Sequence, residues 1–265
     1  VVEFIIYSYT MTIEINNKLN QLLLKNNQGG LYFSEWLKKN GYSDQLLKRY
    51  RDSGWLTSLA RGVMYRTGDK PRSFPVLESY NYQLGKNFHI AAHSALEHAG
   101  FNHYVPMGKP VLMVGHPKEE LVPNWIKNND FDYALKFFST ETFSRPQLVS
   151  FNSYYPHLQV SVPELAFMEC LLLAPKQYSY MDLYYIMEQL TTLRADVMQD
   201  LLEHTGNLRI KRVFLYMAEK AGHYWFDSLS INSIELGTSK YQLVENGIYV
   251  SKYRITVPQE LYDYE

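Results

Sequence analysis

Short apolar runs with helical spacing dominate the first part of the chain. Leucines spaced along one helix face predict a helix over roughly Ile15–Lys25: Leu19, Leu22 and Leu23. Two further apolar pairs, Trp36–Leu37 and Leu46–Leu47, lie on either side of Gly41. Because glycine adopts positive φ at little cost, Gly41 predicts a tight turn between two short helices.

Short polar residues and a glycine set the expected ends of these two helices. We expect Ser34 to cap the first and Ser43 to cap the second, since a serine hydroxyl can accept a free amide of the first turn. Gly54 is expected to end the second helix. Helix, glycine turn and helix form a helix-turn-helix, in which the second helix is the recognition helix.

The segment WLTSLARGVMYR that follows has two apolar–polar runs around Arg61-Gly62. This pattern predicts a β-hairpin that serves as a wing. Residues 11–72 are therefore interpreted as a winged helix-turn-helix DNA-binding domain.

The candidate DNA contacts are the polar and basic side chains of the recognition helix and the wing. Short polar residues at the helix start can approach base edges, and basic residues can reach phosphates or guanine. The candidates are Ser43, Asp44, Gln45, Lys48, Arg49, Arg51, Arg61 and Arg66.

The distribution of charge favours this interpretation. The formal net charge of the 265 residues is only −1. Between Met11 and Arg72, however, eleven basic against five acidic side chains leave about +6, so the rest carries about −7. Attraction to phosphate depends on a local positive surface. A small helical domain with a solvated basic face, and a winged helix that binds a protein, are the alternatives.

Downstream, the stretch TGDKPRSFPVLESY predicts a linker, and residues 80–265 predict a larger mixed α/β domain. A helix is expected over residues 88–100, and strands over residues 109–117, 131–140 and 147–155. Further helices are expected over residues 163–174, 179–191, 194–206 and 210–222, with a strand-like tail over residues 240–258. The predicted fold class is α+β.

No catalytic or metal-binding pattern stands out. Four histidines lie close in sequence, but no HExxH accompanies them, so hydrogen-bonded or surface histidines are the favoured interpretation: His89, His93, His98 and His103. The single cysteine, Cys170, excludes an internal disulfide and a multi-cysteine zinc site. We find no Gly-rich phosphate loop or nucleophile elbow. We therefore expect no enzyme activity, cofactor or metal; a nuclease-like C-terminal domain is the alternative.

The first ten residues, VVEFIIYSYT, are apolar but lack a basic leader and are too short to span a bilayer. Met11 follows directly, so they are either an extension upstream of the usual start or a strand. We expect a cytoplasmic protein without membrane association.

Two long segments of the chain are GLYFSEWLKKNGYSDQLLKRYRDSGWLTSLARGVMYRTGD and HIAAHSALEHAGFNHYVPMG. The first resembles the N-terminal winged helix of the AbiEi family of antitoxins, and the second resembles the start of that family's second domain. LTTLRADVMQDLL, KRVFLYMAEKAGHYW and YRITVP resemble its C-terminal region, so the likeness runs from about Asn16 to Pro258. The chain departs from the family at Ala91, Ala92 and His93, where the family has Gly-Gly-Lys.

This resemblance implies a transcriptional repressor and antitoxin of a type IV toxin–antitoxin system, which acts in abortive infection, a phage defence. The winged helix would bind inverted repeats in operator DNA and repress its own operon. The C-terminal domain would antagonise a nucleotidyltransferase toxin, with no need for a stable complex. A free-standing regulator is the alternative.

A basic cluster lies in the C-terminal part of the chain, at the start of a predicted helix. Arg209, Lys211 and Arg212 precede its apolar run. They are candidates for an antitoxin surface that contacts toxin, RNA or flanking DNA. A solvated helix start is the alternative.

Overall fold

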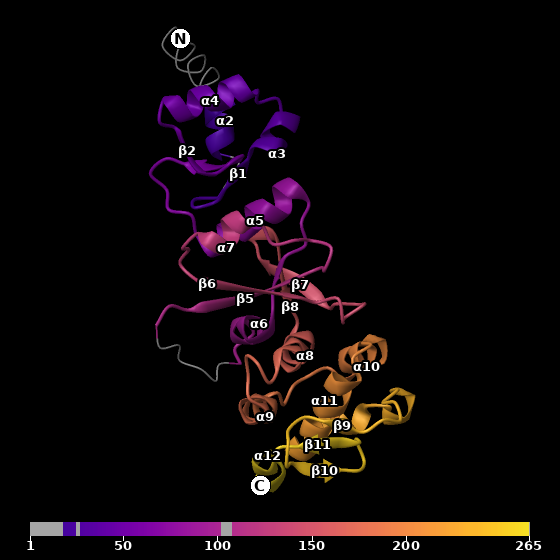
Figure 1. Cartoon of the computed structure of the whole chain (residues 1–265). Coiled ribbons are helices and arrows are strands. Elements are labelled where there is room, and N and C mark those ends of the chain that lie inside the picture. The colour runs from indigo at the N-terminus through magenta and orange to yellow at the C-terminus, as the bar shows by residue number, and fades with distance from the viewer. Residues whose placement is uncertain (1–17, 25–26, 102–107, 265) are drawn as a thin grey trace. The chain divides into compact units, whose positions relative to one another are not determined.

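The computed structural model describes residues 18–24, 27–101 and 108–264 (Figure 1). The described residues form two compact units. One contains the residues up to Asn87 together with Val122–Tyr133 and Asn152–Leu158, and the other contains the remainder. Residues 1–10, both ends of the predicted first helix and His103 lie outside the described residues.

The first unit begins with the predicted helices and hairpin. Its elements are α2 (Lys18–Leu24), β1 (Tyr32–Phe33), α3 (Ser34–Lys39), α4 (Asp44–Asp52), β2 (Leu56–Ala60) and β3 (Val63–Arg66). The three strands pair in the order β1-β3-β2, and both pairs are antiparallel. Helix, strand, two helices and a hairpin that pairs back onto the first strand make up a winged helix, so the predicted helix-turn-helix and wing are confirmed.

A small aromatic and aliphatic core holds these elements together. Its buried members are Leu22, Tyr32, Leu37, Tyr42, Leu47, Tyr50, Leu56 and Met64, with Leu19, Trp36 and Leu46 packed against them. Two phenols keep their hydroxyls satisfied inside the core. Tyr32 donates to the carbonyl of Leu22 at 3.1 Å, and Tyr42 donates to that of Lys18 at 3.0 Å. Both bonds tie α2 to the rest of the winged helix.

Glycines end both short helices in the way their positions predict. Gly41 has φ +83° and Gly54 has φ +75°, and each lies just beyond a helix C-terminus. After α4, the amide of Gly54 donates to the carbonyl of Arg51 and that of Trp55 to the carbonyl of Tyr50. This pair of bonds is a Schellman motif, which satisfies carbonyls that the helix leaves free.

Of the two predicted serine caps, one is confirmed and one is wrong. The hydroxyl of Ser43 accepts the amide of Leu46 at 3.2 Å, as a cap of α4 does. Ser34 is itself the first residue of α3, because β1 continues to Phe33 and leaves no residue between strand and helix. The Ser34 amide donates to the carbonyl of Gly62 at 2.9 Å and so binds the wing turn.

The predicted linker is wrong, because most of it lies in the helix α5 (Ser73–Leu84), which is largely buried in the first unit. Side chains of α5 form hydrogen bonds with the backbone along the outer edge of β1. The amide group of Gln83 accepts from the Phe33 amide at 2.9 Å and donates to the Leu31 carbonyl at 2.7 Å. Ser79 accepts the amide of Leu31 at 3.0 Å. The helix thus covers a strand edge that would otherwise have free polar groups.

Replacing Gln83 with leucine should destabilise the first unit. The change removes the Gln83 partner of the buried Phe33 amide and of the Leu31 carbonyl, which costs about 2–4 kcal/mol in free energy of unfolding. Urea unfolding measures this difference. Gln28→Leu, at an exposed position, is the control and should change stability little. Equal stability of the two variants would contradict the bridging role of Gln83.

The other elements of the chain form a five-stranded sheet, several helices and a small second sheet. The helices are α6 (Ala92–His98), α7 (Asn124–Asn128), which belongs to the first unit, α8 (Pro163–Leu173), α9 (Tyr180–Gln189), α10 (Ala195–His204), α11 (Leu208–Ala221) and α12 (Gln259–Asp263). The strands are β4 (His89–Ile90), β5 (Val111–His116), β6 (Ala134–Ser139), β7 (Leu148–Asn152), β8 (Tyr155–Ser161), β9 (Tyr241–Gln242), β10 (Ile248–Val250) and β11 (Ile255–Val257). The large sheet has the order β6-β5-β4-β8-β7, and the small one β10-β11-β9. Helix and strand together confirm the predicted α+β class.

Two predicted elements differ from the structure. The helix expected over residues 88–100 is divided, since its start forms β4 and only Ala92–His98 is helical. Ala92 itself has φ +49°, a left-handed conformation that glycine adopts more easily. The strand expected over residues 147–155 ends in a turn, and β8 follows it as a separate strand.

An ion pair between the buried Glu164 and the exposed Arg194 fixes the start of α8. Glu164, 2% exposed, accepts the backbone amide of Arg194 at 2.8 Å and two guanidinium bonds of the same residue at 3.0 Å. Burial raises the pKa of the Glu164 carboxyl, but these hydrogen bonds and the charge of Arg194 outweigh it, and the pKa is lowered.

This lowered pKa predicts a pH dependence of stability. The stabilisation is fully present above the unfolded pKa of about 4.3 and is lost as the pH falls through the folded pKa. Glu164→Gln should therefore be less stable at neutral pH by about 1–3 kcal/mol, and the difference should shrink in acid. Urea unfolding at a series of pH values measures it, with exposed Glu260→Gln as control. A difference that is constant with pH would contradict the assignment.

No helix within the described ranges combines the length and the apolar character that crossing a bilayer requires.

Candidate nucleic-acid interface

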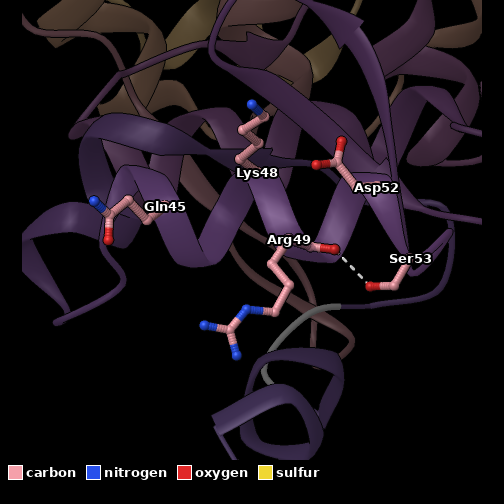
Figure 2. A pocket seen from close by; sticks show the side chains of 5 residues that line it. All are labelled: Gln45, Lys48, Arg49, Asp52 and Ser53. Carbon is pink, nitrogen blue, oxygen red and sulfur yellow. Dashed lines mark hydrogen bonds between the residues drawn. The ribbon is translucent and has the colours of Figure 1, made fainter.

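The exposed face of α4 carries the polar and basic side chains predicted for DNA recognition. Gln45, Lys48 and Arg49 are exposed and line an open depression with Asp52 and Ser53 (Figure 2). In this view Lys48 and Arg49 extend in opposite directions from the helix. Ser53 donates to the Arg49 carbonyl at 2.5 Å and so closes the last turn. Because Lys48 and Arg49 extend in opposite directions, their positive charges lie on both sides of the axis of α4.

The charge of Lys48 and Arg49 is not neutralised by an ion pair among the described residues. Two nearby carboxylates are engaged elsewhere: Asp44 pairs with Lys38 at 2.8 Å, and Glu35 pairs with Lys39 at 2.9 Å. Lys48 and Arg49 thus remain available to phosphate. Within the part of the chain that the structure describes, Asp52 is the one carboxylate that lines the depression.

The other candidates on α4 have partners within the protein. Ser43 caps the helix, and Asp44 is held by Lys38. Arg51 is half-buried, and its guanidinium donates to the sulfur of Met64 at 3.3 Å. Arg51 therefore connects the recognition helix to β3, and its contact with DNA stays a prediction.

The two wing arginines occupy different places. Arg61 is exposed at the hairpin turn, where Gly62 has φ +76°. Arg66 lies opposite Leu56 at the end of β3 and lines a separate depression with Tyr32 and Asp69. Burial, and then the charge of Asp69, raises the pKa of Tyr32 to about 12, while Arg66 opposes this shift. The structure thus does not bring Arg66 into the depression on α4.

Sequence reasoning missed three residues at the end of the recognition helix. Asp52 and Ser53 line the depression. Trp55, which follows Gly54 just beyond the end of α4, is 49% exposed. Gly54 was the sequence signal for Trp55, because a Schellman motif places the residue after its glycine beside the last turn of the helix.

The predicted basic surface at the start of α11 is not formed as expected. Lys211 is 4% and Arg212 1% exposed, and only Arg209 of the three is half-exposed. The Arg212 guanidinium donates to the carbonyls of Leu236 and Ser239, at 2.7 Å for the second. The buried guanidinium needs hydrogen-bond acceptors, and these carbonyls supply them, which gives Arg212 a structural role.

Two of the four clustered histidines, His89 and His93, contact other side chains within the second unit. His89 lies on β4 with its Nε2 3.2 Å from Glu169, and His93 lies on α6 with its Nδ1 2.5 Å from the Tyr178 hydroxyl. Burial, followed by the charge of Lys136, lowers the pKa of His93 to about 4, so this ring is neutral at physiological pH. Within the described ranges, no three His, Cys, Asp or Glu side chains are grouped to hold a metal ion.

Two family models match consecutive parts of the chain. One, described as a transcriptional regulator, AbiEi antitoxin N-terminal domain, matches residues 15–107. The other, described as a transcriptional regulator, AbiEi antitoxin, type IV TA system, matches residues 109–258. No curated protein matches the chain at a significant level of similarity.

Among solved structures, the crystal structure of the RV2827C protein from Mycobacterium tuberculosis is similar in fold. The TM-score is 0.57 at 12% sequence identity, over 85% of each chain. The two family matches together cover nearly the whole sequence, from the winged helix to the end of the small second sheet. The chain therefore belongs to the AbiEi antitoxin family, the transcriptional regulators of type IV toxin–antitoxin systems.

Proposed function

We propose that this regulator binds operator DNA through α4 and the wing, and that it represses its own operon at inverted repeats. The observation that carries the proposal is the pair of exposed cations on α4, Lys48 and Arg49, without ion pairs among the described residues. In helix-turn-helix proteins the second helix enters the major groove with its N-terminal residues at the base edges. Gln45 has the amide that recognises adenine, and Arg61 at the wing turn can follow the backbone.

A salt titration of DNA binding tests this proposal. Fluorescence anisotropy should detect tight binding to a fragment of the chain's own promoter, and binding to a scrambled fragment weaker by about a thousandfold. The logarithm of the affinity should fall linearly with that of the salt concentration, because bound phosphates release counterions. Absence of promoter binding, with a salt-insensitive protein partner instead, would favour a winged helix that serves protein interaction.

We propose further that the chain antagonises a nucleotidyltransferase toxin without catalysis of its own, as the antitoxin of a phage-defence system in the cytoplasm. The description of the family as an antitoxin of type IV systems supports this part. Co-expression with a nucleotidyltransferase encoded beside it should restore the growth that the enzyme alone prevents. Lack of rescue, with promoter binding intact, would favour a free-standing regulator.

A further inference from the structure

Two neighbouring depressions of the second unit share Arg209 and Tyr241 in their walls. The first has a volume of about 410 Å³ and is also lined by Lys176, Gln177 and Tyr180. The second has a volume of about 440 Å³ and is also lined by Asn207, Arg212 and Ser239. Each is of the size of a small-molecule site. Because Arg209 and Tyr241 belong to both, they stand where the two depressions meet.

The charged side chains in these walls all have the same sign. Lys176, Arg209 and Arg212 line the depressions, and no aspartate or glutamate does so among the described residues. An anion placed here meets cations and no opposing carboxylate. In partly buried surroundings this electrostatic preference is larger than on an open surface.

The two arginines are held in place by uncharged partners. Arg209 donates to the carbonyls of Ala174 at 3.0 Å and Leu172 at 3.1 Å, and it lies 3.3 Å from the Tyr180 hydroxyl. Arg212 is bound by carbonyls alone, and burial, followed by the positive charge of Arg254, lowers its pKa. Neither guanidinium forms an ion pair within the part of the chain that the structure describes. Their geometry is fixed, and their charge is not compensated.

The shared wall also offers a flat aromatic face. Tyr241 is 42% exposed where the depressions meet. An exposed ring beside fixed guanidinium groups suits a ligand that joins a planar ring to an anion, because the ring can stack while the anion is bound. Gln177, Gln242 and Ser239 add hydrogen-bonding groups that a heterocycle or sugar can use.

We propose that these joined depressions bind a nucleotide, with its phosphate near Arg209 and Lys176 and its base on Tyr241. The site lies in the second unit and does not depend on DNA binding by α4. A free nucleotide and a nucleotide within a single strand present the same chemistry, so both are probes. Pyrophosphate isolates the contribution of the anion.

Calorimetric titration of the full chain with pyrophosphate, a nucleoside diphosphate and a short single-stranded oligonucleotide tests the proposal. Lys176→Glu should weaken binding of all three by about tenfold, because it reverses an exposed charge in the wall. The matched control Lys127→Glu, an exposed lysine of α7, should leave binding unchanged. Tyr241→Ala should weaken binding of the nucleoside diphosphate by about tenfold and leave binding of pyrophosphate unchanged. Tighter binding of the oligonucleotide than of the diphosphate would identify a strand as the ligand.

Absence of binding by every probe at millimolar concentration would overturn the proposal. Equal weakening by Lys176→Glu and Lys127→Glu would overturn it as well, since binding would then reflect the overall charge. Both lysines are exposed, so neither variant is expected to unfold the chain. A Lys48→Ala/Arg49→Ala variant should keep nucleotide binding, which separates this site from the proposed DNA interface.

Discussion

Replacement of Lys48 and Arg49 by alanine is expected to reduce affinity for operator DNA by about a hundredfold, at roughly tenfold for each lost charged contact. Both side chains are exposed on α4 and make no ion pair among the described residues. They therefore give up few interactions within the protein when they are removed. Their whole effect should appear in binding, because alanine favours helix and the fold is kept.

The same variant should change the salt dependence in a defined way. Each phosphate contact contributes about −0.9 to the slope of log affinity against log salt concentration, so the slope should decrease by about two. Anisotropy titrations at several salt concentrations measure affinity and slope together. A control that removes two exposed lysines outside the winged helix, Lys118→Ala/Lys127→Ala, matches the change in net charge.

Two outcomes would contradict the assignment of α4 as the recognition helix. One is unchanged affinity and slope in the Lys48→Ala/Arg49→Ala variant. The other is an equal loss in the control, which would mean that net charge alone governs binding. Arg51→Ala is informative beside them, because Arg51 bonds to Met64 of β3. A loss of thermal stability without a change in salt slope would show that Arg51 orients the helix.

The winged helix was largely predictable because its signals are local. Gly41 and Gly54 each follow an apolar helical run, and both adopt the positive φ that their positions predict. The hairpin around Gly62 follows from alternation over a few residues. Such signals depend on backbone preferences and side-chain periodicity within one element.

Two of the errors arise where distant segments satisfy polar groups. The stretch containing Pro71 and Pro75 has the composition of a linker, yet α5 forms there because Gln83 pairs with backbone about fifty residues earlier. The burial of Arg212 has the same origin, since the carbonyls of Leu236 and Ser239 come from a later loop. Prediction from the local sequence places basic residues at the start of a helix in solvent. It does not take into account carbonyl partners that come from a distant part of the chain.

Gly115 is a further example of a position that sequence alone does not explain. It lies within β5, where a glycine usually weakens a strand. A Cβ atom at this position would lie 2.5 Å from Nε2 of His89. The glycine therefore makes room for the buried ring of His89, which reaches Glu169 across the interior of the second unit.

Glu169 is the centre of this buried polar group, and its loss should be the most destabilising change in the second unit. The side chain is 0% exposed. Its carboxylate accepts the Ala92 amide at 2.8 Å and the Ser161 hydroxyl at 3.1 Å, and it lies 3.2 Å from Nε2 of His89. One carboxylate thus joins β4, α6 and β8 to α8.

The geometry of Ala92 makes this carboxylate harder to replace. Ala92 holds φ +49°, a conformation that costs an alanine about 1 kcal/mol and persists only where its surroundings favour it. The bond from its amide to Glu169 is one such constraint, because it fixes the first residue of α6 against α8. Removal of the carboxylate should therefore release the start of α6 as well as leave polar groups unpaired.

Glu169→Leu should lower the free energy of unfolding by about 4 kcal/mol or more, because the Ala92 amide, the Ser161 hydroxyl and a nitrogen of His89 become buried without partners. For a chain of this size the midpoint of thermal unfolding should fall by about 10 °C. Glu169→Gln keeps the shape of the side chain and one acceptor oxygen. Its midpoint of thermal unfolding should therefore lie between those of the wild type and the leucine variant. Glu188→Leu, at an exposed position of α9, is the control and should change the midpoint little.

Hydrogen exchange provides a local measure that remains useful if the leucine variant is poorly folded. In Glu169→Gln, the amide of Ala92 should exchange faster than in the wild type, while amides within α11 should change less, because the weakened bond is at the start of α6. Uniform acceleration across the unit would indicate global destabilisation instead. A midpoint equal to that of the wild type in both Glu169 variants would show that the buried carboxylate does not hold these elements together.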